Sequence, residues 1–167
     1  IHPAKALVTY VSVINPETGD SNFIYNTTSP PPPEIAVNIT VENVEYLALW
    51  QVNLTYDPTL LQIANETDVY APSDHVFHDL DPTFTGKDIN NTAGYVLWGC
   101  AANLSLPVNH FNGSGTLMVI NFTITKTPTK DEPLLSCDLV LDTTSLNKTK
   151  LEDPSTSEIP FTEQNGY

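Results

Sequence analysis

Positive charge is scarce in this chain. It has six lysines and no arginine against 20 acidic residues, which gives a formal net charge of −14 at pH 7. Nucleic-acid binding needs clustered cations that displace counterions from phosphates, and anionic lipid surfaces attract the same cations. The composition therefore excludes nucleic acid and anionic lipid as partners. The acidity itself indicates either a solvated surface that resists association or acidic loops that bind Ca²⁺.

Long apolar runs and catalytic signatures are also missing. No apolar run reaches 18 residues, so we expect no insertion into a membrane. The chain does not begin with a charged segment followed by an apolar one, so we expect any secretory signal to be already removed and no anchor to remain. There is no G-x-S-x-G, no H-E-x-x-H and no glycine-rich phosphate loop. We expect a protein that is not an enzyme.

Glycines are few, and 14 prolines argue against a helical bundle. Alternating apolar residues between turn signals predict about nine short strands. The predicted fold is all-β, an antiparallel immunoglobulin-like or jelly-roll β-sandwich, in one domain over residues 1–167. Residues 1–33 are predicted to be a strand followed by a proline-rich connector, and residues 65–92 to be irregular. The predicted strands are 7–14, 35–41, 48–56, 60–63, 94–99, 116–125, 137–142 and 158–162.

The sequence N-x-S/T occurs nine times, where composition predicts about three by chance. In three predicted strands the asparagine falls on the polar face, where a glycan has room. We therefore predict an extracellular, N-glycosylated protein; the alternative is that Asn and Thr simply fill solvent-facing positions. The nine sites are Asn26, Asn38, Asn53, Asn65, Asn90, Asn103, Asn112, Asn121 and Asn147.

The chain has only two cysteines, Cys100 and Cys137. Two cysteines at this spacing form neither a four-thiolate zinc site nor a C-x-x-C redox pair. In an oxidising compartment we expect them to form a disulfide. Closing a loop of about 37 residues would stabilise the fold by roughly 3–4 kcal/mol. The alternative is a pair of buried free thiols.

Acidic residues cluster around residues 74–90. We expect either no cofactor or Ca²⁺, for which Asp79, Asp81 and Asp88, helped by loop carbonyls, are candidate ligands. His75 and His78 are weaker candidates for zinc, because an i, i+3 pair is common by chance and no helix is indicated. The alternative is a polar loop over the rim of the sandwich.

Several segments, read together, resemble the cohesin-like family of β-sandwich domains. The most specific is the strand around Trp50 that runs into Tyr56-Asp57-Pro58, and the second is the Gly113–Leu117 entry to an Ile-x-Phe strand. The similar segments are 39–44, 48–61, 93–96, 113–117 and 120–123, so that the resemblance covers about residues 35–145. The tail at 159–167 is similar to the end of such domains in secreted archaeal proteins.

This resemblance implies a jelly-roll-like sandwich without catalytic activity that binds other proteins or builds surface structures. Bacterial members dock dockerin modules in cellulosomes. This chain departs from them, because it has no dockerin-type D-x-N-x-D-G loop, no neighbouring module and many glycosylation sites. Glycans on the sheet faces would obstruct a dockerin platform, so no dockerin-binding residues are carried over.

Two functions follow as hypotheses. The first is a self-assembling subunit of a surface filament or layer, in which the strand at residues 6–14 completes the sandwich of another copy. Both faces of this strand are largely apolar, with Leu7, Thr9, Val11 and Val13 on one of them, so it is suited to burial on two sides, either in its own sandwich or in a neighbour's. The second is a monomeric recognition module for protein or carbohydrate at a cell surface.

Overall fold

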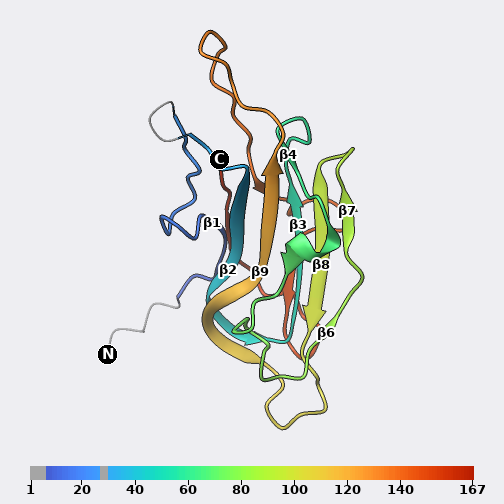
Figure 1. The fold of residues 1–167 in the computed structure, drawn as a ribbon. Helices are drawn as coiled ribbons and strands as arrows, with labels where there is room; N and C mark the ends of the chain where they lie inside the picture. The colour runs from blue at the N-terminus through green and yellow to red at the C-terminus, as the bar shows by residue number, and fades with distance from the viewer. Residues whose placement is uncertain (1–6, 27–29) are drawn as a thin grey trace, which may run out of the picture.

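The computed structural model describes residues 7–26 and 30–167, which form two β-sheets packed face to face (Figure 1). The first, called here the β2–β9 sheet, has the order β12-β1-β2-β9-β4, and β5 also pairs with β9. Its strands are β1 (Tyr10–Ile14), β2 (Glu34–Leu47), β4 (Leu61–Gln62), β5 (Val69–Tyr70), β9 (Phe111–Ile124) and β12 (Thr162–Gln164).

The second sheet, called here the β3–β8 sheet, has the order β10-β3-β8-β6, with β11 also beside β3 and β7 also beside β8. A single 3-10 turn, η1 (Glu66–Asp68), is the only helical element in the described residues. None of the described helical structure is long and apolar enough to cross a membrane. The strands of this sheet are β3 (Leu49–Thr55), β6 (Thr83–Phe84), β7 (Asp88–Asn90), β8 (Tyr95–Ala101), β10 (Val140–Leu141) and β11 (Lys150–Glu152).

The core lies between the sheets and follows the two-residue period of the strands. In β2, Val37 and Ile39 are fully buried, and they lie opposite Ile120 and Met118 of β9, which are fully buried too. In β3, the inward residue Trp50 is fully buried, and its ring meets that of Trp98 at 5.7 Å in an edge-to-face arrangement. Alternation of this kind places one face of each strand in the core.

The predicted β-sandwich fold is confirmed, with 12 strands in the described chain instead of about nine. The difference lies mainly in residues 65–92, predicted to be irregular, where β5, β6 and β7 are strands of two or three residues. Segments this short show no periodicity, and only their pairing with β8 and β9 defines them. The sheets are also not wholly antiparallel, because β1 and β12 pair in parallel.

The N-terminal strand lies inside its own sandwich, so the predicted donor strand is wrong. β1 pairs with β2 on one side and with β12 on the other, which leaves neither edge open. Val11 and Val13 are fully buried, whereas Leu7 and Thr9 precede the strand. Residues 1–6, which include the first residue of the predicted donor segment, lie outside the described residues.

The predicted disulfide is also contradicted, because Cys100 and Cys137 are both free thiols. Cys100 lies opposite Trp50, whereas Cys137 Sγ accepts a hydrogen bond from the Asp57 backbone N–H (3.2 Å). Trp50 and Asp57 are separated by the length of β3, roughly 20 Å at 3.3 Å per residue. A disulfide needs Cα atoms within about 7 Å of each other, so the strand register keeps the two thiols apart.

Removing the Trp50 side chain should destabilise the fold strongly, because Trp50 is fully buried between the sheets. We expect Trp50→Ala to lower the free energy of unfolding by about 3–5 kcal/mol through the cavity that it leaves. Leu146→Ala, at a side chain that is 99% exposed, is the control and should change it little. Urea denaturation measures both, and a loss below about 1 kcal/mol for Trp50→Ala would contradict the packing described here.

Thiol titration tests the register of the second sheet. Unfolded in denaturant without reductant, the chain should react with Ellman's reagent at two thiols, because neither is oxidised. In the folded chain Cys100 should react much more slowly, since burial raises its pKa to about 12 and hides the sulfur. Finding no titratable thiol in unfolded, unreduced protein would overturn the separation of the two cysteines.

Candidate functional site

The outer face of the β3–β8 sheet is formed by the outward residues of its two central strands. Side chains alternate along a strand, so the residues between the core positions of β3 point outward. β8 alternates in phase with β3, because Leu49 lies opposite Ala101 and Thr55 opposite Tyr95. We call this surface the β3–β8 face. Its half-buried outward side chains are Leu49, Gln51, Thr55, Tyr95, Leu97 and Ala101.

Gly99 lies in the outward phase at the middle of β8, opposite Gln51, and is itself buried. A Cβ at this position would lie 3.0 Å from the Trp50 carbonyl oxygen and 3.4 Å from Thr85 Oγ1. The Gly99 N–H donates to Thr85 Oγ1 (2.9 Å), and this hydroxyl donates to the Gly99 carbonyl (3.2 Å). A glycine inside a strand permits another chain to approach the backbone closely.

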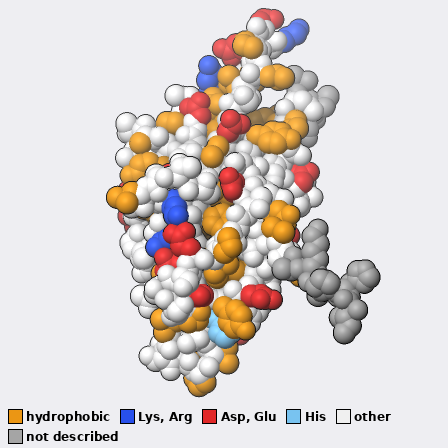
Figure 2. Space-filling model, turned by 180° about the vertical axis from the view of Figure 1, so that it is seen from behind, with side chains coloured by type: hydrophobic (Ala, Val, Ile, Leu, Met, Phe, Trp, Pro, Cys, Tyr) orange, Lys and Arg blue, Asp and Glu red, His pale blue; other side chains and the backbone are white. Residues whose placement is uncertain are grey.

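Two ion pairs lie along one edge of this face. Lys150 Nζ lies 2.7 Å from Glu152 Oε1, and Lys148 Nζ lies 2.9 Å from Glu158 Oε2. On the side of the molecule seen in Figure 2, basic side chains are few and acidic ones are spread over the surface. The β3–β8 face therefore offers neutral, half-apolar contacts at its centre and ion pairs along one edge.

A loop of residues 142–149 interrupts the edge strand beside β3. β10 pairs with the C-terminal end of β3, and β11 pairs with its N-terminal half. Between them, Thr149 Oγ1 accepts from the Asn53 N–H (3.0 Å) and donates to the Asn53 carbonyl (3.2 Å), which replaces the missing strand pairing. Gln51 Nε2 donates to the Lys148 carbonyl (2.8 Å), so the loop folds over the outer face.

This loop buries Asn53. The side chain points out of the sandwich, as the strand phase predicts, but the residue is only 8% exposed. Its Nδ2, the atom to which a glycan would be attached, donates to the Asn147 carbonyl (3.0 Å). The structure therefore contradicts a glycan at Asn53 in the folded chain.

The other eight predicted glycosylation sites are accessible to different degrees. Asparagines in turns and loops are more open than those in strands, because strand neighbours cover part of the side chain. Asn26, Asn65, Asn112 and Asn147 are exposed; Asn38, Asn90, Asn103 and Asn121 are half-buried. Glycosylation at these eight positions stays a prediction.

The strand sequons are distributed unequally between the two sheets. Asn38 and Asn121 lie at the centre of the β2–β9 sheet and point outward, opposite Val119 and Ala36. Asn90, in β7, lies opposite Tyr95 at one end of the β3–β8 face. Glycans at these positions would cover the outer face of the β2–β9 sheet and only one end of the β3–β8 face.

At the opposite end of the β3–β8 face, around Leu49 and Ala101, the sequon within β3 and β8 is that of the buried Asn53. The nearest along the chain is Asn103, just beyond β8, and its Nδ2 donates to Asp81 Oδ2 (3.0 Å). A glycan at Asn103 would border this end, whereas no accessible sequon lies within β3 or β8 themselves.

The predicted calcium ligands do not come together. Asp81 bonds with Asn103, beyond the end of β8, whereas Asp88 Oδ2 accepts from the Tyr95 hydroxyl at its start (2.9 Å). The length of β8, roughly 20 Å, separates the two contacts. In residues 7–26 and 30–167, Asp79, Asp81 and Asp88 form no metal-binding group, and neither does any other set of three His, Cys, Asp or Glu side chains.

The two histidines of the zinc hypothesis contact their own loop. His75 is buried, and its Nδ1 accepts from the Phe77 N–H (3.3 Å). Burial, and secondly the nearby His78, lower the pKa of His75, so its ring is neutral at pH 7. His78 Nδ1 lies 2.8 Å from the His75 carbonyl, and its Nε2 lies 2.9 Å from Asp79 Oδ2. These contacts fit the polar-loop alternative.

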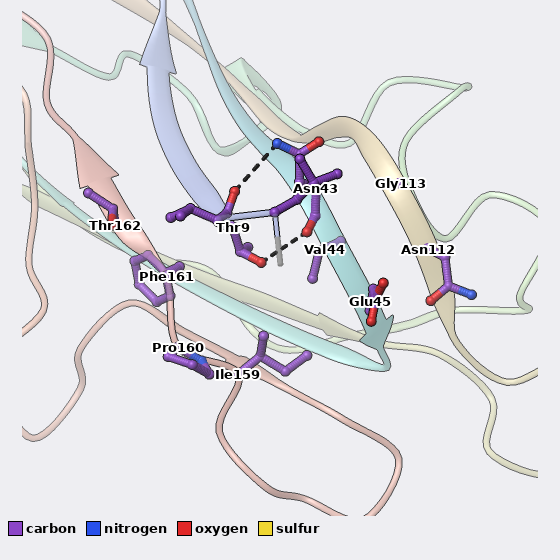
Figure 3. Close-up of a pocket in the computed structure, with 12 residues that line it drawn as sticks. Thr9, Asn43, Val44, Glu45, Asn112, Gly113, Ile159, Pro160, Phe161 and Thr162 are labelled. Atoms are coloured by element: carbon purple, nitrogen blue, oxygen red, sulfur yellow. Dashed lines mark hydrogen bonds between the residues drawn. The ribbon is translucent and has the colours of Figure 1, made fainter. Parts of the chain in front are cut away.

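A groove of about 890 Å³ opens at the end of the sandwich where β1 begins (Figure 3). One wall is the approach to β1, which Thr9 Oγ1 and Asn43 Nδ2 tie to β2 by bonds of 3.0 and 3.4 Å. The lining residues come from four segments that are distant in sequence. They are Leu7, Val8, Thr9, Asn43, Val44, Glu45, Asn112, Gly113, Ile159, Pro160, Phe161 and Thr162.

The backbone beside the groove is strained. Asn43 and Tyr46 have φ values of 54° and 59°, in the left-handed region that non-glycine residues rarely adopt. They lie where β2 shifts register against β9, and Asn112 Oδ1 accepts the Tyr46 N–H (2.7 Å). Neither the groove nor the β3–β8 face was predicted from sequence, because both depend on which segments the fold brings side by side.

Comparison with known proteins supports the fold. The family model described as "Cohesin domain" matches residues 21–156. A non-cellulosomal cohesin from the archaeon Archaeoglobus fulgidus is 17% identical, with a TM-score of 0.63 over 96% of this chain and 88% of that one. The second type II cohesin module of the adaptor ScaA scaffoldin of Acetivibrio cellulolyticus is 15% identical, with a TM-score of 0.67 over 95% and 88%.

Another similar structure is a type II cohesin in complex with an X-dockerin from Acetivibrio cellulolyticus, 15% identical, with a TM-score of 0.63 over 95% of this chain and 98% of that one. No curated protein sequence matches the chain.

The family match spans most of the chain and includes both segments that carry the sequence resemblance. The strand around Trp50 is β3, which ends before Tyr56-Asp57-Pro58, and Gly113–Leu117 is the bulged first half of β9. The sandwich built from them has the fold of solved cohesins over nearly its whole length. The chain belongs to the cohesin family.

Proposed function

We propose that this domain is an extracellular protein-recognition module that docks a partner protein on the β3–β8 face. Cohesin domains are protein–protein interaction modules, and two of the similar structures are cohesins in complex with dockerins. The observation that carries the assignment to this face is the burial of Asn53 beneath the 142–149 loop. Because Asn53 is buried, a glycan has no room there while the loop covers it, and the proposal leaves this central sequon unmodified.

The shape and chemistry of the β3–β8 face suit a protein partner. Leu49, Leu97 and Ala101 supply half-buried apolar surface at its two central strands. Interface centres in proteins are depleted of charge and bordered by polar groups. The paired ions of Lys148 and Lys150 supply such a border along one edge.

The proposed partner is a dockerin-type module. Glycans on the sheet faces would obstruct such a partner. The burial of Asn53 makes a glycan at the centre of the β3–β8 face unfavourable, so this obstacle does not apply there. Asn90 lies at the Tyr95 end of the β3–β8 face, and two further strand sequons, Asn38 and Asn121, point outward from the β2–β9 sheet. Glycans there would shield the β2–β9 sheet and leave the docking end of the β3–β8 face open.

Docking can be tested with one matched pair of substitutions. Ala101→Arg places a long charged side chain at the open end of the β3–β8 face, and Ala36→Arg places the same side chain on the outer face of the β2–β9 sheet. We expect isothermal titration calorimetry to show that at least one dockerin module of a panel binds the unmodified chain. We further expect Ala101→Arg to weaken its binding at least about tenfold, because the interface cannot close over the arginine.

Ala36→Arg is the control and should bind as the unmodified chain does. If Ala36→Arg removes binding and Ala101→Arg does not, the docking face is on the other sheet. If no dockerin in the panel binds, the proposed partner class is wrong.

Glycopeptide mapping of protein from its source cell tests the extracellular part of the proposal. We expect the intact mass to exceed the 18.3 kDa of the polypeptide by several kDa. Glycans should occupy the exposed sites Asn26, Asn65, Asn112 and Asn147 most fully, whereas Asn53 should be unmodified. A bare polypeptide mass would refute the glycoprotein, and a fully glycosylated Asn53 would refute the covering loop.

A further inference from the structure

A segment after β9 projects from one end of the sandwich. We call residues 125–138 the arm; Figure 1 shows this orange segment extending well beyond both sheets. It has a defined turn, because the Glu132 N–H donates to the Thr129 carbonyl (3.1 Å) and Glu132 Oε2 accepts from the Thr129 N–H (2.8 Å). Prolines at 128 and 133 restrict the backbone on either side of the turn.

The arm presents apolar surface to solvent. Leu134, just past the turn, is 89% exposed and is followed by the half-buried Leu135. Burying a pair of leucines against a partner removes their apolar surface from water, which favours association. The apolar surface of the arm is therefore available for contact with another molecule.

The groove lies at the opposite end of the same strand. Gly113, near the start of β9, lines the groove, and the arm begins after Ile124, where β9 ends. Eleven residues of extended strand separate the two by roughly 36 Å. An arm therefore cannot reach the groove of its own molecule, whereas it is free to reach the groove of another.

The groove complements the arm in its chemistry. Its rim exposes Leu7 (76%) and Val8 (46%), and Pro160 is also exposed. Among the described residues that line it, Glu45 is the only charged one. The arm carries Lys126 and Lys130, two of the six lysines in the whole chain.

The two arm lysines differ in their surroundings. Lys126 lies close to Glu132 and, after the backbone bond from Thr129, helps to lower the pKa of that carboxyl. Among the described residues, Lys130 forms no ion pair. Lys130 is the cation available to Glu45.

We propose that the arm of one copy docks in the groove of the next, with Leu134 against the Val8 rim and Lys130 near Glu45. The arm and the groove lie at opposite ends of the molecule, so a pair of copies joined by one contact still has one free arm and one free groove. Further copies can add at both, and the contact propagates into an open head-to-tail chain. This inference goes beyond the proposed docking of a partner on the β3–β8 face and uses none of its residues. It assigns self-assembly to the arm and the groove instead of the N-terminal strand.

A glycan at Asn112 is compatible with this contact. Asn112 stands on the groove rim, but Figure 3 shows its amide nitrogen turned away from Pro160 and Phe161. Its Oδ1 is held by the Tyr46 N–H, which keeps the amide in this orientation.

Sedimentation velocity of the full chain over a concentration series tests the proposal. The unmodified chain should form species that grow with concentration. Leu134→Asp on the arm and Val8→Asp on the groove rim should each raise the apparent dissociation constant by about tenfold or more. The matched controls are Leu146→Asp and Ile24→Asp, at side chains 99% and 72% exposed, and they should associate as the unmodified chain does. Circular dichroism checks that every variant is folded.

Mixing the two defective variants is the decisive measurement. The Leu134→Asp chain keeps an intact groove and the Val8→Asp chain keeps an intact arm, so an equimolar mixture can form one contact and no more. We expect heterodimers and nothing larger. A self-complementary interface between like surfaces cannot give this result.

Three results would overturn the proposal. One is an unmodified chain that stays monomeric at every concentration. Another is a mixture of the two folded variants that forms no heterodimer. The third is a chain that associates only after residues 1–6 are deleted, because the groove would then belong to the chain's own N-terminus. None of these results bears on dockerin binding, so they are distinct from a failure of the proposed function.

Discussion

The edge-to-face packing of Trp50 against Trp98 positions most of the β3–β8 sheet. Trp50 lies opposite Cys100 on one side and Leu151 on the other, so its burial aligns β8 and β11 with β3. Trp98 extends the contact outward, since Phe84 stacks on it at 4.9 Å and its Nε1 donates to the Thr85 carbonyl (3.0 Å). The same stack lies where β6 pairs with β8, since Phe84 is opposite Cys100. The β3–β8 face thus depends on the aromatic core beneath it.

The interruption of the edge strand beside β3 makes the two halves of the β3–β8 face differ. A continuous strand beside β3 would leave Asn53 open to solvent, whereas the excursion between β10 and β11 brings Thr149 to its backbone and Asn147 to its side chain. This arrangement lowers the stability gained at Asn53, because its Oδ1 is buried without a hydrogen-bond partner. The same loop holds Gln51 through the bond from its side chain to the Lys148 carbonyl.

The two ends of the sandwich have different roles in the same framework. β2 and β9, 14 residues each, run the full length of the molecule and connect the groove at one end to the arm at the other. Register shifts in β2 near Val41 and Val44 open the groove, and the strained Tyr46 is held there by Asn112. A partner on the sheet face and a second copy at the ends would therefore occupy separate surfaces, which makes recognition and assembly compatible in one domain.

The sequence alone was enough for the sandwich, its long strands and the family. Two-residue periodicity is a local property, so Ile39 and Trp50 showed their inward phase without any structure. The burial of Asn53, the separation of Cys100 from Cys137 and the enclosure of Val11 between two strands were decided only in the tertiary structure. Each depends on which segment lies opposite which. Strand register and loop coverage come from contacts between residues that are distant along the chain, and no local pattern encodes them.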